Sequence, residues 1–367
     1  MPILINPKFM KSIASILLTL VICGIFVCRS SSNVNRAKAV FEEYIKALQR
    51  GFSTQAKTYW NKQELKQYKS FDWQWVYLTF QGLNPAYLYY KITDAKEQDG
   101  YVVLQVEWFY REGKAGPIQK DTRYFLEEDG RVVGANPIFI HTRGWLQKES
   151  KHFIYHFKPK QDPPTGGLLK KMDLFFEKVT GNLQVEYPFK IHYYQCDSAG
   201  EVGWLFDLEP SQARSQPMNG LAASTQEFAP HEIVHIISYQ ILPQNGKKLT
   251  PVYLDEGLAY YLGGASFLSS EQLIETAKKE IEVCDSISLL DLMHDPWAYG
   301  VNQSAALLCS LAKYLIEIHG MPKFKELFSA GESYDEQPEM IFEIYDQSIE
   351  QLQIEWKRFV LELPPKR

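Results

Sequence analysis

Apolar side chains recur with a helical period near the start of the chain. Phe41, Tyr44, Ile45 and Leu48 follow the i, i+3, i+4, i+7 spacing that places side chains on one face of a helix. A second helix is expected near residues 54–68. Both predicted helices precede a stretch in which the hydrophobic period changes.

That stretch alternates apolar and polar residues, as half-buried strands do. The alternation predicts four strands, near residues 86–93, 101–110, 123–128 and 131–140. The pairs Asp99-Gly100 and Asp129-Gly130 favour hairpins, because Asp and Gly tolerate the left-handed backbone of tight turns. Residues 34–145 are therefore expected to form an α+β unit with an antiparallel sheet.

The N-terminus has the pattern of an export signal or membrane anchor. Lys8 and Lys11 precede an uncharged run of 17 residues, 12–28, which ends at Arg29. This length lies at the short limit for a membrane span, and the leading positive charge favours a cytoplasmic N-terminus with the rest exported. We expect an extracytoplasmic protein anchored by residues 12–28. A cleaved signal, which would make it secreted, and a lipid anchor remain alternatives.

Composition narrows the class of protein. The chain has 367 residues, is 45% hydrophobic and 23% charged, and suits an N-terminal segment (1–33) followed by two globular domains (34–145 and 146–367). A net charge of −5 means that the chain has no excess of basic residues of the kind that binds nucleic acid. Five cysteines without a Cys-x-x-Cys pair argue against a cysteine metal site or a disulfide framework.

The segment His231-Glu232-Ile233-Val234-His235 carries the strongest chemical signal. On a helix, residues four apart lie on one face, so His231 and His235 can bind one metal ion, and Glu232 can take a proton from water. Such a string would arise by chance in roughly one chain in a hundred of this composition. Apolar neighbours predict a buried helix, in which unpaired His and Glu side chains would be costly without a cation.

A third ligand has to come from another helix. Ser238 and Ile241 stand where a metzincin has Gly and His, so the chain lacks that extended motif. Glu256, in the middle of a helix expected to start at Thr250-Pro251 and stop at Gly263-Gly264, is the predicted third ligand. Gly257 and Ala259 are small enough for a neighbouring helix to approach. Asp255 is expected to orient a ligand histidine, with direct ligation as the alternative.

These motifs resemble those of the gluzincins, zinc metallopeptidases of the peptidase-MA-like superfamily. The resemblance implies zinc bound by His231, His235 and Glu256, with Glu232 as general base. It spans roughly 146–335 and implies a mainly helical domain with a small sheet. Its implied elements are a strand over 149–156, a helix near 168–179, a strand near 189–195 and a long helix over 304–319.

The same resemblance implies an aromatic or imidazole donor to the oxyanion of the tetrahedral intermediate. Tyr299 is the predicted catalytic residue for this role, with His294 as the second candidate and a packing role as the alternative. Pro230 is expected to be the first residue of the metal-binding helix. The segment 218–224 would then be a neighbouring strand or loop to which an extended peptide could add.

Residues 34–145 resemble, by element order alone, the cone fold of scytalone-dehydratase-like and nuclear-transport-factor-like domains. The aromatic side chains of this region either fill a core or line a ligand pocket: Trp60, Trp73, Trp75, Tyr87, Tyr89, Tyr90 and Trp108. Further along, acidic and aromatic helices near 338–363 look amphipathic. The expected fold class is therefore α+β, a cone-like unit followed by a mainly helical gluzincin-type unit.

Taken together, the sequence predicts a membrane-tethered zinc metallopeptidase that acts on a peptide or protein substrate and binds no nucleic acid. Two alternatives stay open. One is a non-catalytic extracytoplasmic binding protein with a structural or vestigial metal site. The other is a zinc hydrolase of a non-peptide amide, because the chemistry of the metal would be the same.

Overall fold

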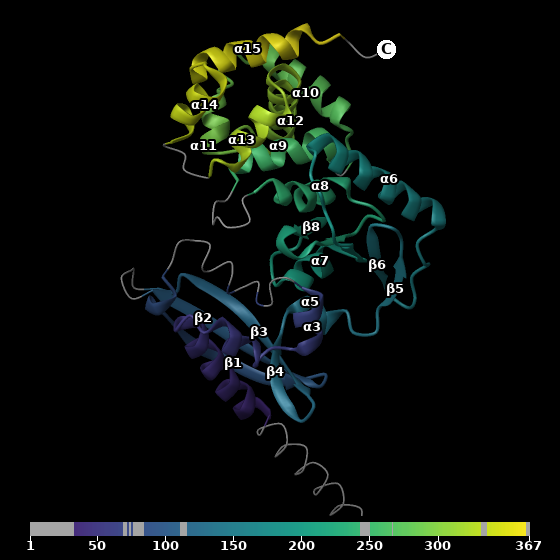
Figure 1. The fold of residues 1–367 in the computed structure, drawn as a ribbon, viewed down its shortest axis with the longest axis vertical. Helices are drawn as coiled ribbons and strands as arrows, with labels where there is room; N and C mark the ends of the chain where they lie inside the picture. The colour runs from purple at the N-terminus through teal and green to yellow at the C-terminus, as the bar shows by residue number, and fades with distance from the viewer. Residues whose placement is uncertain are drawn as a thin grey trace, which may run out of the picture. The chain divides into compact units, whose positions relative to one another are not determined.

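The computed structural model of the chain (Figure 1) divides into two compact units between Arg143 and Gly144. The residues described are 33–68, 72, 75, 84–110, 116–242, 250–265, 267–331 and 336–364. The apolar run 12–28, predicted as an anchor, lies outside this set. Within the set, no helix combines the length and the apolarity needed to cross a membrane.

The first unit contains a four-stranded antiparallel sheet in the order β1-β2-β3-β4. Its strands are β1 (Leu88–Gln98), β2 (Tyr101–Tyr110), β3 (Gln119–Glu128) and β4 (Arg131–Ala135). Asp99-Gly100 and Asp129-Gly130 connect β1 to β2 and β3 to β4, and all four residues have positive φ. Both predicted hairpins are confirmed. The fourth strand is shorter than predicted, because Pro137 starts helix α5 (Pro137–His141) where the strand was expected to continue.

Helices cover this sheet. Residues 33–49 are helical, as the Phe41 to Leu48 pattern predicts. The single helix expected near 54–68 is instead two short helices, α2 (Ser53–Lys57) and α3 (Lys62–Gln67). Between them Trp60 forms a β-bridge with Gly134, and the Asn61 side chain caps α3 by accepting from the amides of Gln63 and Glu64. These contacts outweigh the helical periodicity of the segment.

Aromatic side chains fill the core between the helices and the sheet. Trp60, Trp75 and Trp108 are buried and pack with Phe41, whereas Tyr87 and Tyr89 are exposed. Trp73 lies outside the described residues. The core interpretation of the aromatics therefore holds for the three tryptophans. The resemblance to the cone fold stays a prediction.

The second unit contains a five-stranded sheet in the order β5-β6-β7-β9-β8. Its strands are β5 (Leu146–Glu149), β6 (Phe153–Phe157), β7 (Ile191–Gln195), β8 (Ala213–Gln216) and β9 (Leu221–Ser224). The three central strands run parallel, and each edge strand is antiparallel to its neighbour. A 3-10 turn, η2 (Pro217–Asn219), joins β8 to β9.

Two sequence predictions about this sheet are wrong in detail. The single strand expected over 149–156 is a hairpin, because Asp173 accepts from Ser150 Oγ at 2.8 Å and from the His152 amide at 2.9 Å, which fixes a turn. The strand within 218–224 is β9, which is paired on both sides. The strand at this edge of the sheet, where a peptide could add by backbone pairing, is β8 instead.

Helices make up most of the second unit, as predicted. They are α6 (Gly166–Leu183), α7 (Ala199–Phe206), α8 (Pro230–Ser238), α9 (Val252–Gly263), α10 (Ser270–Val283), α11 (Leu289–His294), α12 (Val301–His319), α13 (Met321–Ser329), α14 (Gln337–Tyr345) and α15 (Ile349–Glu362). Shorter 3-10 segments are η1 (Pro85–Tyr87), in the first unit, and η3 (Tyr239–Ile241). The mixed α+β class with two small sheets is confirmed.

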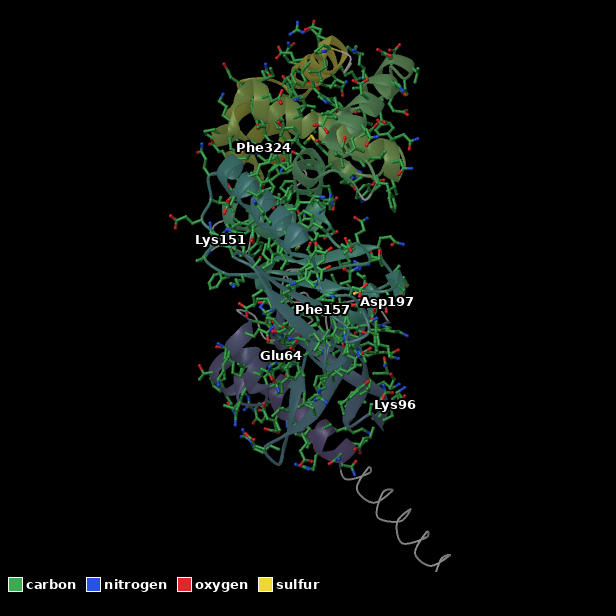
Figure 2. All side chains as sticks on the ribbon, turned by 90° about the vertical axis from the view of Figure 1, so that its right-hand side faces the viewer. Glu64, Lys96, Lys151, Phe157, Asp197 and Phe324 are labelled. Atoms are coloured by element: carbon green, nitrogen blue, oxygen red, sulfur yellow. The ribbon has the colours of Figure 1, made fainter. Side chains whose placement is uncertain are left out.

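One continuous hydrophobic core joins the sheet and the helices of this unit. Phe157 on β6 and Phe324 on α13, both labelled in Figure 2, are buried in it at opposite ends. The helices α8, α9 and α12 contribute to this core, and their core-facing side chains have almost no contact with solvent. The predicted metal-binding helix is thus held on both sides by packed apolar residues.

Candidate metal centre

Helix α8 begins at Pro230, the position at which a missing amide hydrogen costs least. Ile233, Val234, Ile236 and Ile237 are completely buried and fix the helix in the core. His231 and His235 stand one turn apart on its other face. Their Nε2 atoms lie 3.0 Å apart, close enough to share one ion.

Helix α9 brings Glu256 to the two histidines. Its Oε2 lies 3.4 Å from His231 Nε2, and its Oε1 lies 3.8 Å from His235 Nε2. One ligand atom from each of the three residues can be chosen so that all lie within 4.8 Å of one another. The start of α9 differs from the prediction by one residue, because Pro251 is the N-cap and Thr250 forms no cap hydrogen bond.

Two glycines of α9, Gly257 and Gly263, allow this helix to pack closely against α12 and α8. A Cβ atom on Gly263 would lie 2.7 Å from both N and Cα of His231, and one on Gly257 would lie 2.8 Å from the Leu308 carbonyl oxygen of α12. Real Cβ contacts are longer, so a side chain at either position would force the helices apart. The expected close approach at Gly257 is therefore confirmed, and its partner is α12.

An oxygen atom on the far side of each imidazole orients the ring. His231 Nδ1 lies 3.2 Å from the Gly264 carbonyl oxygen, which can only accept, so this nitrogen donates. His235 Nδ1 lies 3.0 Å from Asp255 Oδ2. With Nδ1 facing these oxygens, Nε2 of each ring faces the carboxylate of Glu256. This is the arrangement that holds metal-binding histidines in a fixed tautomer.

The distances fit zinc. A tetrahedral ion with bonds of about 2.1 Å holds its ligand atoms about 3.4 Å apart. The two Nε2 atoms lie 3.0 Å apart, and each faces a different oxygen of Glu256, Oε2 at 3.4 Å from His231 and Oε1 at 3.8 Å from His235. Two imidazoles and one carboxylate leave a fourth position for water or substrate, as in catalytic rather than structural zinc sites. The residues present thus fit the metal that the sequence motifs imply.

The electrostatics of the site also favour a cation. Burial alone would lower the pKa of His235, but the charges of Asp255, Glu256 and Glu232 outweigh it and raise that pKa to about 10. Burial raises the pKa of Asp255. The neighbouring His235 outweighs burial and holds that pKa below its usual value. Three carboxylates around two histidines therefore create a negative potential that a metal ion would neutralise.

Tyr260 is a site residue that the sequence reasoning missed. Its ring lies 4.6 Å from the ring of His231, centroid to centroid, and its hydroxyl is hydrogen-bonded to Glu256. Burial raises the pKa of Tyr260, and the charges of Glu256 and Glu232 raise it further, so the hydroxyl keeps its proton. The sequence spacing could have identified Tyr260, because it follows Glu256 by four residues and therefore lies on the same helix face.

The structure places Tyr299 in a different set of contacts. Its hydroxyl accepts from the Ser288 amide at 2.7 Å and donates to Asp291 Oδ2 at 3.0 Å, which ties the start of α12 to α11. His294 is the exposed last residue of α11. Neither residue belongs to the described cluster of potential metal ligands, which consists of His231, His235 and Glu256.

Comparisons with known proteins give little beyond this geometry. No family model matches the chain, and no curated protein does. Among solved structures, the chain is similar to a point mutant of an M1 zinc metallopeptidase from Deinococcus radiodurans, with 12% sequence identity and a TM-score of 0.33. The match covers 76% of this chain and 63% of that protein, less than two thirds of its length. A likeness at this TM-score fixes neither the fold nor the activity.

Proposed function

We propose that the chain is a zinc-dependent hydrolase that cleaves peptide bonds. The observation that carries the proposal is the convergence of His231, His235 and Glu256, with both histidine Nε2 atoms turned toward the carboxylate by the Gly264 and Asp255 oxygens. A site so prepared binds a metal through three protein ligands and keeps one position open. Zinc, when bound there, would polarise the scissile carbonyl and lower the pKa of water.

Glu232 is the proposed general base. It follows His231 on α8, is partly exposed, and lies near enough to the ligands for its charge to act on His235 and Tyr260. A carboxylate in this position can take the proton of the attacking water and pass it to the leaving amine. A purely structural metal site would need no such group beside its ligands, which favours catalysis over the binding-protein alternative.

Tyr260 is the proposed donor to the oxyanion of the tetrahedral intermediate. Its protonated hydroxyl beside Glu256 and its ring against His231 place it at the metal centre. Tyr299, the residue favoured by the sequence, has its hydroxyl hydrogen-bonded to Ser288 and Asp291, neither of which belongs to the described metal centre. A preorganised donor aimed at developing negative charge is worth a few kcal/mol in the transition state.

The edge of β8 is the proposed binding place for an extended substrate. The Thr225 amide donates to the Gln212 carbonyl at 2.9 Å, so in this antiparallel pair the N–H and C=O groups of Ala213 and Ser215 point away from β9. The strand packs against α8, the helix with both histidines. A peptide paired to this edge would lie along the metal-binding helix.

The place of action proposed from the sequence is outside the cytoplasm, with residues 12–28 as a membrane anchor. The support is the charge pattern of the N-terminus, Lys8 and Lys11 before an uncharged run. Protease added to intact cells should digest the two units while a cytoplasmic marker protein survives. Protection of the units until the cells are lysed would contradict this placement.

The test of the proposed function combines metal content with hydrolysis. Purified full-length protein should contain about one zinc per chain by elemental analysis, and His235→Ala should lose it. Glu232→Gln should keep the zinc and lose about 10²- to 10⁴-fold in cleavage of a fluorogenic peptide library, because only the base is removed. No zinc uptake on titration, or full activity in Glu232→Gln, would contradict the proposal.

A further inference from the structure

A hollow on the second unit lies between α11, α14 and the start of α15. Its volume is about 440 Å³. The lining residues are Leu290 of α11, Pro338, Glu339, Phe342 and Glu343 of α14, and Ser348, Ile349 and Glu350 at the start of α15. None of them belongs to the metal centre, so the hollow is a second feature of this unit.

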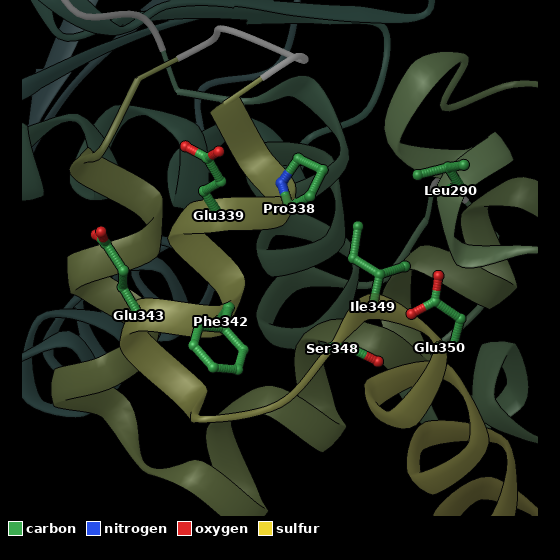
Figure 3. Close-up of a pocket in the computed structure, with 8 residues that line it drawn as sticks. All are labelled: Leu290, Pro338, Glu339, Phe342, Glu343, Ser348, Ile349 and Glu350. Carbon is green, nitrogen blue, oxygen red and sulfur yellow. The ribbon is translucent and has the colours of Figure 1, made fainter.

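The floor of the hollow is apolar and open. Figure 3 shows Pro338, Phe342 and Ile349 in its middle, with Leu290 at the far wall. Leu290 is 42% exposed and Phe342 is 57% exposed, although both are large apolar side chains. Covering such surface with another apolar group is favourable, because it removes apolar area from water. Grouped exposure of this kind marks interaction sites more often than isolated apolar residues do.

The rim is acidic. Glu339 and Glu343 stand on one side of the apolar floor and Glu350 on the other, all three exposed (Figure 3). Among the described residues none of the three forms a salt bridge, and no Lys or Arg lines the hollow. The carboxylates therefore present uncompensated negative charge around an apolar surface.

Helix stability explains part of this charge but not all of it. Glu339 and Glu350 lie in the first turns of α14 and α15, where a negative side chain favours the helix dipole. Hydrogen bonds with Ser348 and its own backbone also lower the pKa of Glu350. Glu343 lies in the second half of α14, where the dipole gives a carboxylate no benefit. The helix dipole therefore does not account for Glu343 on the rim.

The walls of the hollow are anchored to the helices of the metal centre. Tyr253 of α9 donates to the buried side chain of Gln337, the first residue of α14, at 2.8 Å. Trp356 of α15 donates to Ser310 of α12 at 3.1 Å, and the Leu289 amide of α11 donates to Gln353 of α15. A preformed surface on fixed elements loses little entropy on binding.

From this geometry we infer that the hollow docks a protein or peptide segment in which a large apolar side chain is flanked by lysines or arginines. The apolar anchor would cover Phe342, Leu290 and Ile349, and the basic residues would face Glu339, Glu343 and Glu350. A small molecule fits less well, because ligand pockets bury most of their ligand whereas this hollow is open. The inference does not depend on the proposed hydrolysis.

The test measures binding directly. A fluorescein-labelled peptide with a Leu-Phe pair flanked by lysines should bind the full-length protein, as followed by fluorescence anisotropy, and more weakly at high salt. The variants Phe342→Ser and Glu343→Lys should each weaken binding about tenfold or more. Two matched changes outside the hollow, Ile354→Ser on α15 and Glu282→Lys on α10, should leave it unchanged; both residues are exposed.

Two further comparisons separate this inference from the proposed function. The metal-site variant His235→Ala should bind the peptide like the wild type, so a failed metal site would not be mistaken for a failed docking site. A peptide with glutamates in place of the lysines should not bind. Lack of binding by the basic peptide, or equal binding by Phe342→Ser, Glu343→Lys and the two control variants, would overturn the inference.

Discussion

Glu232 and Glu256 are both carboxylates beside the same two histidines, yet the contacts of their side chains differ. Glu256 faces both Nε2 atoms and is hydrogen-bonded to Tyr260, so its position is fixed as a ligand's should be. Among the described residues, no hydrogen bond or ion pair holds the side chain of Glu232. This freedom suits the general-base role proposed for Glu232, in which the carboxylate would accept a proton and release it.

The two tyrosines considered for the oxyanion can be separated by mutation. Tyr260→Phe should lower kcat about 10²-fold with a smaller change in KM, because the hydroxyl would act mainly in the transition state. Tyr299→Phe should leave kcat unchanged and lower stability by about 1 kcal/mol, through lost hydrogen bonds to Ser288 and Asp291. Steady-state kinetics and thermal unfolding of both variants decide between them. The reverse pattern would return the role to Tyr299.

At the scale of elements, the site depends on how closely α8, α9 and α12 pack. The sequence made the two helices of the candidate metal centre predictable, together with the start of α8 and the end of α9, since Pro230 and Gly263-Gly264 are strong local signals. It did not reveal that Gly263 touches the backbone of His231, because that contact joins residues 32 positions apart and depends on tertiary packing. Replacing Gly263 by alanine, which adds one methyl group, tests this packing.

We expect Gly263→Ala to weaken zinc binding at least tenfold and to lower stability by about 1–3 kcal/mol, because its Cβ would meet His231 at 2.7 Å. Isothermal titration with zinc and denaturant unfolding measure the two effects. Gly181→Ala in α6 is the matched control, since nothing lies within 4 Å of its added Cβ. That change should leave zinc binding intact and raise stability by up to about 1 kcal/mol. Equal zinc affinity in both variants would contradict the packing argument.

In the first unit, Glu64 of α3 joins that helix to the start of α5. Its buried carboxylate accepts from Trp60 Nε1 at 2.9 Å and from the Asn136 amide at 3.0 Å. Burial outweighs these hydrogen bonds and raises the pKa of Glu64 to about 8. The ordinary pKa of Glu is near 4.5. At pH values between about 4.5 and about 8, Glu64 is therefore protonated in the folded unit and ionised in the unfolded chain.

The stability of the first unit should therefore fall as pH rises from about 4.5 to about 8 and then level off. Glu64→Gln cannot ionise, so the variant should lose this downward slope even if its absolute stability is lower. Urea unfolding of both proteins at a series of pH values, followed by the fluorescence of the buried tryptophans, gives the comparison. A variant that keeps the full slope would show that another group is responsible.

At the scale of the whole molecule, each unit has its own hydrophobic core. Periodicity was enough to predict the helices and strands of the first unit, because it is a local feature, whereas the helix-rich second part was expected from the resemblance carried by the metal-binding motifs. The strand order β5-β6-β7-β9-β8 was beyond reach, since it depends on which segments pair across the sheet. For that reason the sequence pointed to the segment holding β9 as the peptide-binding strand, whereas the structure gives the edge to β8.

Two independent cores predict two unfolding transitions, only one of which depends on the metal. Zinc that binds only the folded second unit should raise its transition temperature in proportion to the logarithm of free zinc, and a chelator should remove that shift. The transition of the first unit, which holds none of the proposed ligands, should stay constant. Calorimetry of the wild type and His235→Ala, each with and without zinc, provides the check. A zinc-dependent shift of both transitions would contradict independent unfolding.

The edge strand β8 also gives the molecule a site at which it could aggregate. Backbone groups that can pair with a peptide can pair equally with the same strand of a second molecule, which is how sheets grow into aggregates. Here the edge is four residues long, and Ser211 Oγ already donates to the outward carbonyl of Ala213 at 2.7 Å. Lengthening this strand with β-branched residues would therefore favour the proposed pairing with a peptide and, equally, pairing between copies of the protein.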